Sequence, residues 1–182
     1  MKSKKILVYI LAFFISLGVI FSSVILYYNV NYPIKYNNLI KQYSYQYSLS
    51  PYLVASIINT ESSFNSKAVS SSGAIGLMQI LPSTGEYIAD LLNEEDYQIE
   101  KLFNPETNVK YGCFYLNYLN KKFNNESSVL CAYNAGETLV RSWLNDKELS
   151  VDGKKLNKIP YKVTESYLNK INKGKKHYIN RI

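Results

Sequence analysis

The sequence has few of the side chains that build metal centres and nucleophilic catalytic sites. Its 182 residues include two cysteines and one histidine, and it contains no CxxC motif. This shortage argues against a zinc site and against Ser-His-Asp or Cys-His catalysis. Two cysteines also cannot cross-link a small scaffold, so the fold must depend on a hydrophobic core, for which 47% apolar residues are ample. Any chemistry should therefore depend on carboxylates, hydroxyls and amides.

The sequence also lacks long alternating β patterns, internal repeats and low-complexity blocks. Its length predicts one domain. Helix-start signals predict helices, because Ser50-Pro51 and Asn104-Pro105 each place a capping residue before a proline at the first helical position. The class is predicted as all-α, with at most a small β element in the glycine-containing loop of residues 62–76. The expected helices cover residues 36–47, 51–61, 82–92, 104–123, 127 or 128–136, 138–144 and 163–173.

Charge is absent between Lys5 and Lys35, and residues 6–28 form an apolar run of 23 residues. As a helix this run spans about 35 Å, enough to cross a membrane core of about 30 Å. It is long for a cleaved signal peptide, and its cleavage site is weak. We therefore favour an uncleaved signal anchor over a cleaved peptide. Lysines precede the run and none directly follows it, which predicts residues 1–5 in the cytoplasm and the rest outside. Residues 29–38 are expected to be a connector.

Acidic residues are scarce at the C-terminus, where residues 151–182 carry nine basic and two acidic side chains within a chain of net charge +7. These lysines are either simply solvated or attract an anionic surface such as phospholipid or a polyanionic wall. Nucleic acid is disfavoured as a partner because no nucleic-acid-binding fold accompanies the charge.

The external location permits a disulfide between Cys113 and Cys131, but the predicted geometry argues against one. In a helical hairpin turning near residues 124–127, the two residues would be offset by about 10 Å along the axis. Two buried thiols are expected.

Glu61 is a carboxylate on the apolar face of a predicted helix. It continues the apolar stripe of Leu53 and Ile57 by one more turn, and no basic residue lies near it on the same helix. One interpretation is an exposed residue or a cap at the helix end. The other is a general acid whose pKa is raised by burial.

Three sequence blocks help to decide between these interpretations of Glu61. Residues 61–84 read ESSFNSKAVSSSGAIGLMQILPST, residues 102–116 read LFNPETNVKYGCFYL, and residues 129–143 read VLCAYNAGETLVRSW. In this order and spacing, the blocks closely resemble the catalytic domain of SLT-family lytic transglycosylases, whose lysozyme-like fold is shared with goose-type lysozyme. The resemblance implies one lysozyme-like helical domain, α+β at most, over residues 39–173 behind the transmembrane helix. Residues 174–182 are expected to be a basic tail.

The resemblance also implies roles for individual residues. Glu61 matches the single catalytic acid and base, acting on peptidoglycan glycan strands without a metal or cofactor. The expected substrate-binding positions are Ser70, Gly76, Gln79, Leu81, Tyr133 and Asn134. Among these, the Tyr133 hydroxyl is expected near the catalytic carboxylate, and Gly76 where the backbone must stay close to the glycan.

One block departs from the family pattern. Residues 159–168, IPYKVTESYL, resemble the segment IPxxETxxYV, but Val163 occupies the glutamate position. Glu165 lies about 200° further around a helix and cannot simply replace that glutamate. The interpretation remains a membrane-anchored lytic transglycosylase that forms 1,6-anhydromuramic ends. The alternatives are a muramidase on the same fold and a non-catalytic wall-binding module of a secretion or sporulation assembly.

Overall fold

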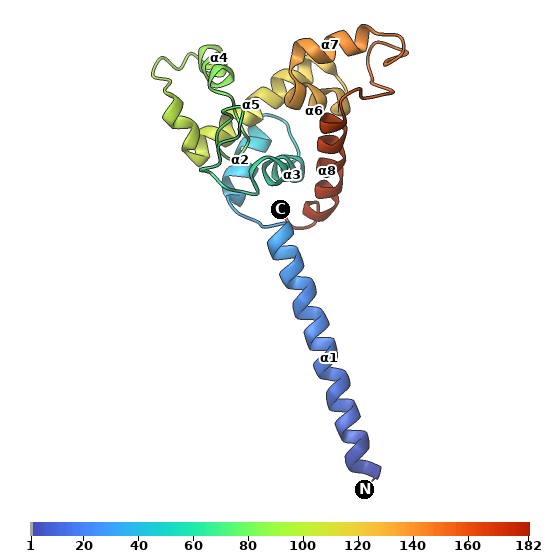
Figure 1. The fold of residues 1–182 in the computed structure, drawn as a ribbon. Helices are drawn as coiled ribbons and strands as arrows, with labels where there is room; N and C mark the ends of the chain where they lie inside the picture. Colours follow the sequence, from blue (N-terminus) through green and yellow to red (C-terminus); the bar gives the residue numbers. More distant parts are fainter. Residues whose placement is uncertain (1) are drawn as a thin grey trace. The chain divides into compact units, whose positions relative to one another are not determined.

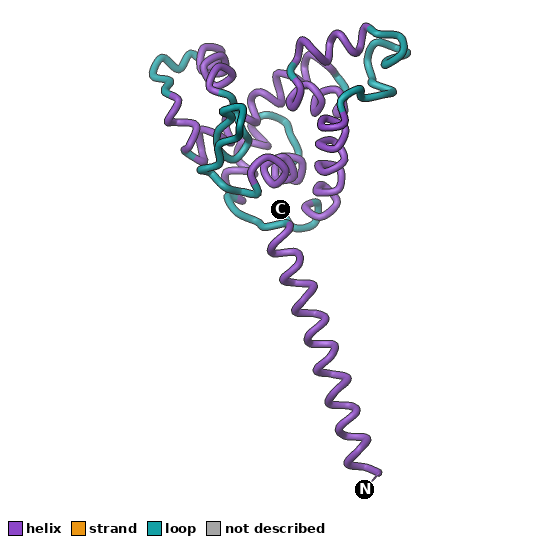
Figure 2. Tube along the Cα trace, in the orientation of Figure 1, coloured by secondary structure: helices purple, strands orange, loops and turns teal. Residues whose placement is uncertain are grey.

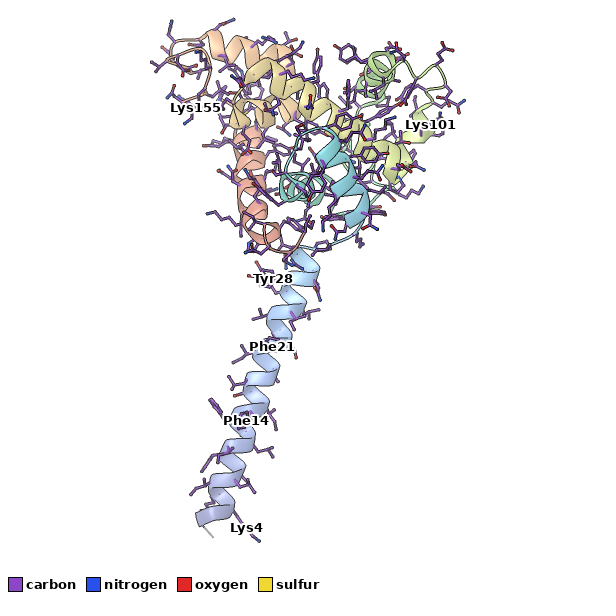
Figure 3. The ribbon with its side chains drawn as sticks, turned by 180° about the vertical axis from the view of Figure 1, so that it is seen from behind. Lys4, Phe14, Phe21, Tyr28, Lys101 and Lys155 are labelled. Atoms are coloured by element: carbon purple, nitrogen blue, oxygen red, sulfur yellow. The ribbon has the colours of Figure 1, made fainter. Side chains whose placement is uncertain are left out.

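A computed structural model describes residues 2–182, and the chain divides into two compact units, Met1–Pro33 and Ile34–Ile182. The first unit consists of helix α1 (Lys2–Asn31), whose described part from Lys4 to Asn31 is long and apolar enough to cross a membrane. The labelled side chains Phe14 and Phe21 point outward from it (Figure 3). By length and composition α1 confirms the predicted apolar helix, although a signal sequence would pass the same test.

Two polar side chains in α1 have their hydroxyls satisfied within the helix. Ser16 Oγ donates to the Phe13 carbonyl at 2.7 Å, and Ser23 Oγ donates to the Val19 carbonyl at 2.8 Å. Such internal bonds matter in hydrocarbon, where an unpaired hydroxyl is costly. These serines are therefore compatible with a membrane-spanning helix.

The second unit is a helical domain (Figure 1, Figure 2). Its elements are α2 (Asn37–Gln46), α3 (Pro51–Ser62), α4 (Pro82–Leu92), the short 3₁₀ helix η1 (Ile99–Phe103), α5 (Pro105–Phe123), α6 (Glu126–Ala135), α7 (Glu137–Asn145) and α8 (Lys162–Tyr178). The predicted all-α class is confirmed. The loop between α3 and α4 also contains the small β element, as the bridges Val69–Ile75 and Ile75–Ile80.

Helix α3 is the central element of this domain, and it packs mainly against α8 (Figure 1). The Ser56 hydroxyl in the middle of α3 donates to the Ile171 carbonyl of α8 at 2.8 Å. Gly174 of α8 faces the same hydroxyl, and a Cβ there would lie 2.2 Å from Ser56 Oγ. Because glycine lets the two backbones approach closely, the helix that carries Glu61 is held firmly in the core.

Some helix boundaries differ from expectation, and one short helix was not expected. Helix α8 ends at Tyr178 rather than at residue 173, because Gly174 and Tyr178 are buried against α3 and Phe64. Residues 174–178 therefore belong to a packed helix and not to a separate basic tail. Helix η1 was not anticipated. Helix α6 starts at residue 126 because Asn125 Oδ1 accepts a bond from the Ser128 amide at 3.1 Å.

The two cysteines are free and fully buried, as the sequence predicts. Burial raises the pKa of both thiols, Cys131 to about 11. Both therefore stay protonated and act as small core side chains.

Candidate active site

Glu61 lies in the last turn of α3 and is partly buried. Burial raises the pKa of its carboxyl from 4.5 to about 7, against a smaller lowering effect from the Tyr167 hydroxyl. No ion pair in the part of the chain that the structure describes includes Glu61. The carboxyl is therefore populated in both its acidic and its basic form near neutral pH, as a group that donates and then accepts a proton must be.

Two tyrosines from different helices face this carboxyl. Tyr133 in α6 donates its hydroxyl hydrogen bond to the Met78 carbonyl at 2.8 Å. Tyr167 in α8 is only 6% exposed, and its hydroxyl has no hydrogen-bond partner among the described residues, although it lies close enough to act on the Glu61 pKa. Burial first, and the charge of Glu61 second, raise the pKa of both tyrosines well above its ordinary value. Both therefore remain protonated; the Tyr133 hydroxyl donates to the Met78 carbonyl, whereas the Tyr167 hydroxyl acts on Glu61.

The loop after α3 is held against α5 by Asn108. Its Oδ1 accepts from the Met78 amide at 2.7 Å, and its Nδ2 donates to the Ile75 and Leu102 carbonyls at 2.9 and 2.8 Å. Gly76 has φ 79°, and a Cβ there would lie 2.4 Å from Asn108 Nδ2. Glycine is therefore required at this position by the positive φ and by the contact with Asn108, whether or not a glycan also lies close to this backbone.

The remaining predicted residues fall into two groups. Gln79, Leu81, Tyr133 and Asn134 line one pocket of about 210 Å³, together with Thr84, Tyr115 and Gly136 among others. Ser70 instead shapes the loop, where its Oγ accepts from the Ala74 amide at 3.0 Å. Because the Tyr133 ring lines the pocket while its hydroxyl lies near Glu61, this tyrosine connects the pocket to the carboxylate.

The side chains of Gln79 and Asn134 are anchored in this wall. Gln79 has φ 50°, and its Nε2 donates to the Gly76 carbonyl at 3.0 Å. Asn134 Oδ1 accepts from the Thr164 hydroxyl at 2.9 Å, which ties α6 to α8.

Val163, which replaces the glutamate of the family segment, and Glu165 both lie on the outside of α8. Val163 is 76% exposed, and Glu165 is exposed beside lysines of the same helix. In the structure as described, no other carboxylate contributes to the pKa of Glu61. Neither residue therefore supplies a second buried acid beside Glu61.

Sequence reasoning missed Asn108 and Tyr167. The signal for Asn108 is an amide directly before Val109 on the inner face of a helix, where an unpaired polar group would be costly. Tyr167 lies in the segment of residues 159–168, at the tyrosine of the family pattern IPxxETxxYV. Within residues 2–182, no group of three His, Cys, Asp or Glu side chains has an arrangement that could hold a metal ion.

Comparisons with known proteins agree with this geometry. The family model described as "Transglycosylase SLT domain" matches residues 38–155. The soluble lytic murein transglycosylase of Escherichia coli strain K12 is 34% identical over 143 residues, which are 77% of this chain and 22% of that protein. The membrane-bound lytic murein transglycosylase C of Histophilus somni strain 2336 is 30% identical over 168 residues, covering 79% of this chain and 46% of the relative.

Solved structures show the same fold. The 70 kDa soluble lytic transglycosylase of Escherichia coli superposes with a TM-score of 0.71 at 30% identity, covering 82% of this chain and 25% of that protein. Its complex with bulgecin A superposes with a TM-score of 0.72. This chain thus spans about a quarter of the soluble enzyme's length and less than half of the membrane-bound relative's.

Proposed function

Because the chain belongs to the transglycosylase SLT domain family, we propose that it is a membrane-anchored lytic transglycosylase that cleaves the MurNAc-β-1,4-GlcNAc bond of peptidoglycan. The observation that carries the proposal is the Glu61 carboxyl, whose pKa of about 7 results from burial in a site without a compensating cation. Glu61 acts on the pKa of both Tyr133 and Tyr167, and Tyr133 also lines the pocket of about 210 Å³, which supports the same function.

In the proposed reaction, Glu61 acts first as an acid. It protonates the glycosidic oxygen while the bond from that oxygen to C1 of the muramic residue breaks. The substrate's own acetamido group stabilises the positive charge that develops at C1. Tyr167, which stays protonated, stabilises the Glu61 carboxylate that this step leaves behind.

Glu61 then acts as a base. It takes the proton of the muramoyl 6-hydroxyl while that oxygen forms a new bond to C1, which closes a 1,6-anhydro ring. The proton lost in the first step is thereby regained, so the balance needs no water, metal or cofactor. One carboxylate is sufficient for this route, whereas glycosidases that use water normally need two.

The presence of one carboxylate, Glu61, also predicts which hydroxyl group attacks C1. A hydroxyl already held beside C1 gains up to about 7–11 kcal/mol over bulk water from proximity. Since Val163 and Glu165 both lie on the outside of α8, neither is placed to activate water. We therefore expect the intramolecular route rather than the muramidase route.

Digestion of purified peptidoglycan followed by mass analysis tests this proposal. The wild-type chain should release fragments that end in 1,6-anhydromuramic residues, one water lighter than hydrolysed ends. Glu61→Gln should lower the rate by about 10²–10⁴-fold or more, because glutamine cannot transfer the proton. Glu165→Gln is the matched control and should remain close to wild type. Near-normal activity of the Glu61 variant contradicts the mechanism, and a digest dominated by reducing muramic ends identifies a muramidase.

We also propose the location of the enzyme. Helix α1 would cross the cell membrane once, with residues 1–5 in the cytoplasm and the domain from Ile34 outside, where peptidoglycan lies. The lysines at residues 2, 4 and 5 support this orientation because positive charge favours the cytoplasmic side.

A further inference from the structure

Three tyrosines continue outward from the pocket wall at Tyr133. The Tyr133 and Tyr115 rings lie 5.8 Å apart between centroids, and Tyr115 stacks on Tyr118 at 5.9 Å with an interplanar angle of 15°. Tyr118 in turn meets Tyr87 edge to face at 5.8 Å. The aromatic row therefore begins at the tyrosine beside Glu61 and ends on the surface. We call Tyr87, Tyr115 and Tyr118 the tyrosine ledge.

The tyrosine ledge is continuous with the pocket. Tyr115 of α5 and Thr84 of α4 both line the pocket. Tyr87 follows Thr84 by three residues on α4, so it lies on the same face of that helix, one turn further along. Helices α4 and α5, which carry the ledge, are in contact (Figure 1). A chain that occupies the pocket and extends past Thr84 would thus pass over these rings.

The outer rings are held in place although they are not core residues. Tyr87 is 43% exposed, yet its hydroxyl is hydrogen-bonded to the Tyr118 hydroxyl at 2.8 Å. Lys122 Nζ lies 4.3 Å from the centre of the Tyr118 ring and also donates to Glu137 Oε1 at 2.9 Å. These contacts orient the rings in advance, which lowers the entropy that a ligand must overcome.

The charges around the ledge point to a neutral ligand. Glu137 accepts from both Lys122 and Arg141, so the nearby cations already have an anionic partner. What remains for a ligand is the exposed part of the Tyr87 ring and the partly exposed Tyr115 and Tyr118 rings, with the paired Tyr87 and Tyr118 hydroxyls at their edge. This combination suits a pyranose ring, which presents C–H groups on its faces and hydroxyls at its rim.

We propose that the tyrosine ledge is an additional glycan subsite, which binds an N-acetylhexosamine residue of the strand beyond those next to the cleaved bond. This inference rests on the proposed function, because it requires a glycan strand in the adjoining pocket. Its consequence is a dependence on strand length. Oligosaccharides long enough to reach Tyr118 and Tyr87 bind more tightly than those that occupy only the pocket.

Binding of β-1,4-linked N-acetylglucosamine oligomers to the full-length Glu61→Gln protein in detergent tests the proposal without turnover. Calorimetry would compare a hexasaccharide with a disaccharide. Tyr87→Ala and Tyr118→Ala should each weaken hexasaccharide binding by about 3- to 10-fold, the range expected for losing one aromatic contact. Disaccharide binding should not change. Tyr118→Phe, which keeps the ring, should lose less than Tyr118→Ala.

Tyr45→Ala is the matched control, since Tyr45 is 68% exposed on α2 and makes no part of the ledge. It should bind both oligomers like the Glu61→Gln parent. If the parent binds the hexasaccharide and the ledge variants bind it equally well, the subsite is overturned while the proposed function stands. If the parent binds neither oligomer, both proposals fall. Circular dichroism of each variant separates loss of the fold from loss of the contact.

Discussion

At the scale of single residues, the proposed chemistry depends on a carboxyl that forms no ion pair among the described residues. Glu61 extends an apolar helical stripe into the core, so its charged form loses hydration that no ion pair replaces. Tyr167 offsets a part of this cost, and the result is a pKa of about 7. The same environment that makes Glu61 a proton donor at neutral pH therefore makes its ionised form unfavourable for stability.

This coupling predicts how stability changes with pH. Between about pH 4.5 and 7 the folded protein keeps the Glu61 proton that the unfolded chain has released, so stability is lost as the pH rises through this window. Glu61→Gln cannot ionise and therefore avoids this loss. The difference in free energy of unfolding between Glu61→Gln and wild type should shift in favour of the variant by up to about 3 kcal/mol from pH 4 to pH 8. Urea denaturation at both pH values measures this. Glu165→Gln should show no such pH-dependent gain, and an equal response of both variants would contradict the assignment.

The same pKa predicts the activity profile. Since the first step needs the protonated carboxyl, kcat/KM should fall about tenfold per pH unit above about pH 7. Rates of peptidoglycan solubilisation across pH 5–9 would show the decline. A decline that begins near pH 4.5 would mean that the Glu61 carboxyl is not desolvated in the working enzyme.

At the scale of elements, the loop between α3 and α4 matters as much as the helices. It has little regular structure, yet Asn108 of α5 satisfies its backbone through the Ile75 carbonyl and the Met78 amide. Tyr133 of α6 adds a bond to the Met78 carbonyl. Buried backbone groups that are paired in this way make a loop rigid. The wall that carries Gln79 is thus positioned by two helices that are distant in sequence.

Two glycines of this loop provide a controlled test. Gly76 and Gly73 have φ of 79° and 80°, so alanine is strained at both positions. Only at Gly76 would the new Cβ also collide with Asn108 Nδ2 and the Leu102 carbonyl, whereas nothing lies within 4 Å at Gly73. Thermal or urea denaturation should show a loss of about 1–2 kcal/mol for Gly73→Ala and about 2–5 kcal/mol for Gly76→Ala. Equal losses in free energy of unfolding would show that a side chain at residue 76 does not clash with Asn108.

At the scale of the whole molecule, the chain combines a bare apolar helix with a packed helical domain. Helix α1 ends at Asn31, and the second unit begins at Ile34. So short a connection would keep the second unit close to the membrane in the proposed topology. The proposed enzyme would then act on the peptidoglycan strands within reach of the membrane.

The proposed topology can be tested on intact cells. A protease added from outside should degrade the domain after Asn31, while the N-terminal segment with Lys4 and Lys5 stays protected. The physical reason is the asymmetry of charge across α1, which has lysines only at its start. Immunoblotting with tags at the two ends would report both parts. A released, shortened protein as the main species would show instead that α1 is a cleaved signal sequence.

Much of the helical pattern was predictable because its signals are local. Asn104 caps α5 as expected, with Oδ1 accepting from the Glu106 and Thr107 amides at 2.9 and 3.1 Å. Ser50 precedes Pro51 at the start of α3 as predicted, although its side chain makes no capping bond. The position of Glu61 on an apolar face could likewise be read from neighbouring residues, since helical spacing alone determines it.

What the sequence by itself determined is therefore most of the helices, the apolar span and one carboxylate on the apolar face of a helix. The tertiary structure decided which groups meet that carboxylate, because Tyr133 and Tyr167 come from helices far along the chain. It also decided that α8 continues to Tyr178, since that turn is stabilised by packing on α3 and Phe64 and not by a local signal. Capping and periodicity act over a few residues, whereas burial, and with it the pKa of Glu61, depends on how all the helices pack together.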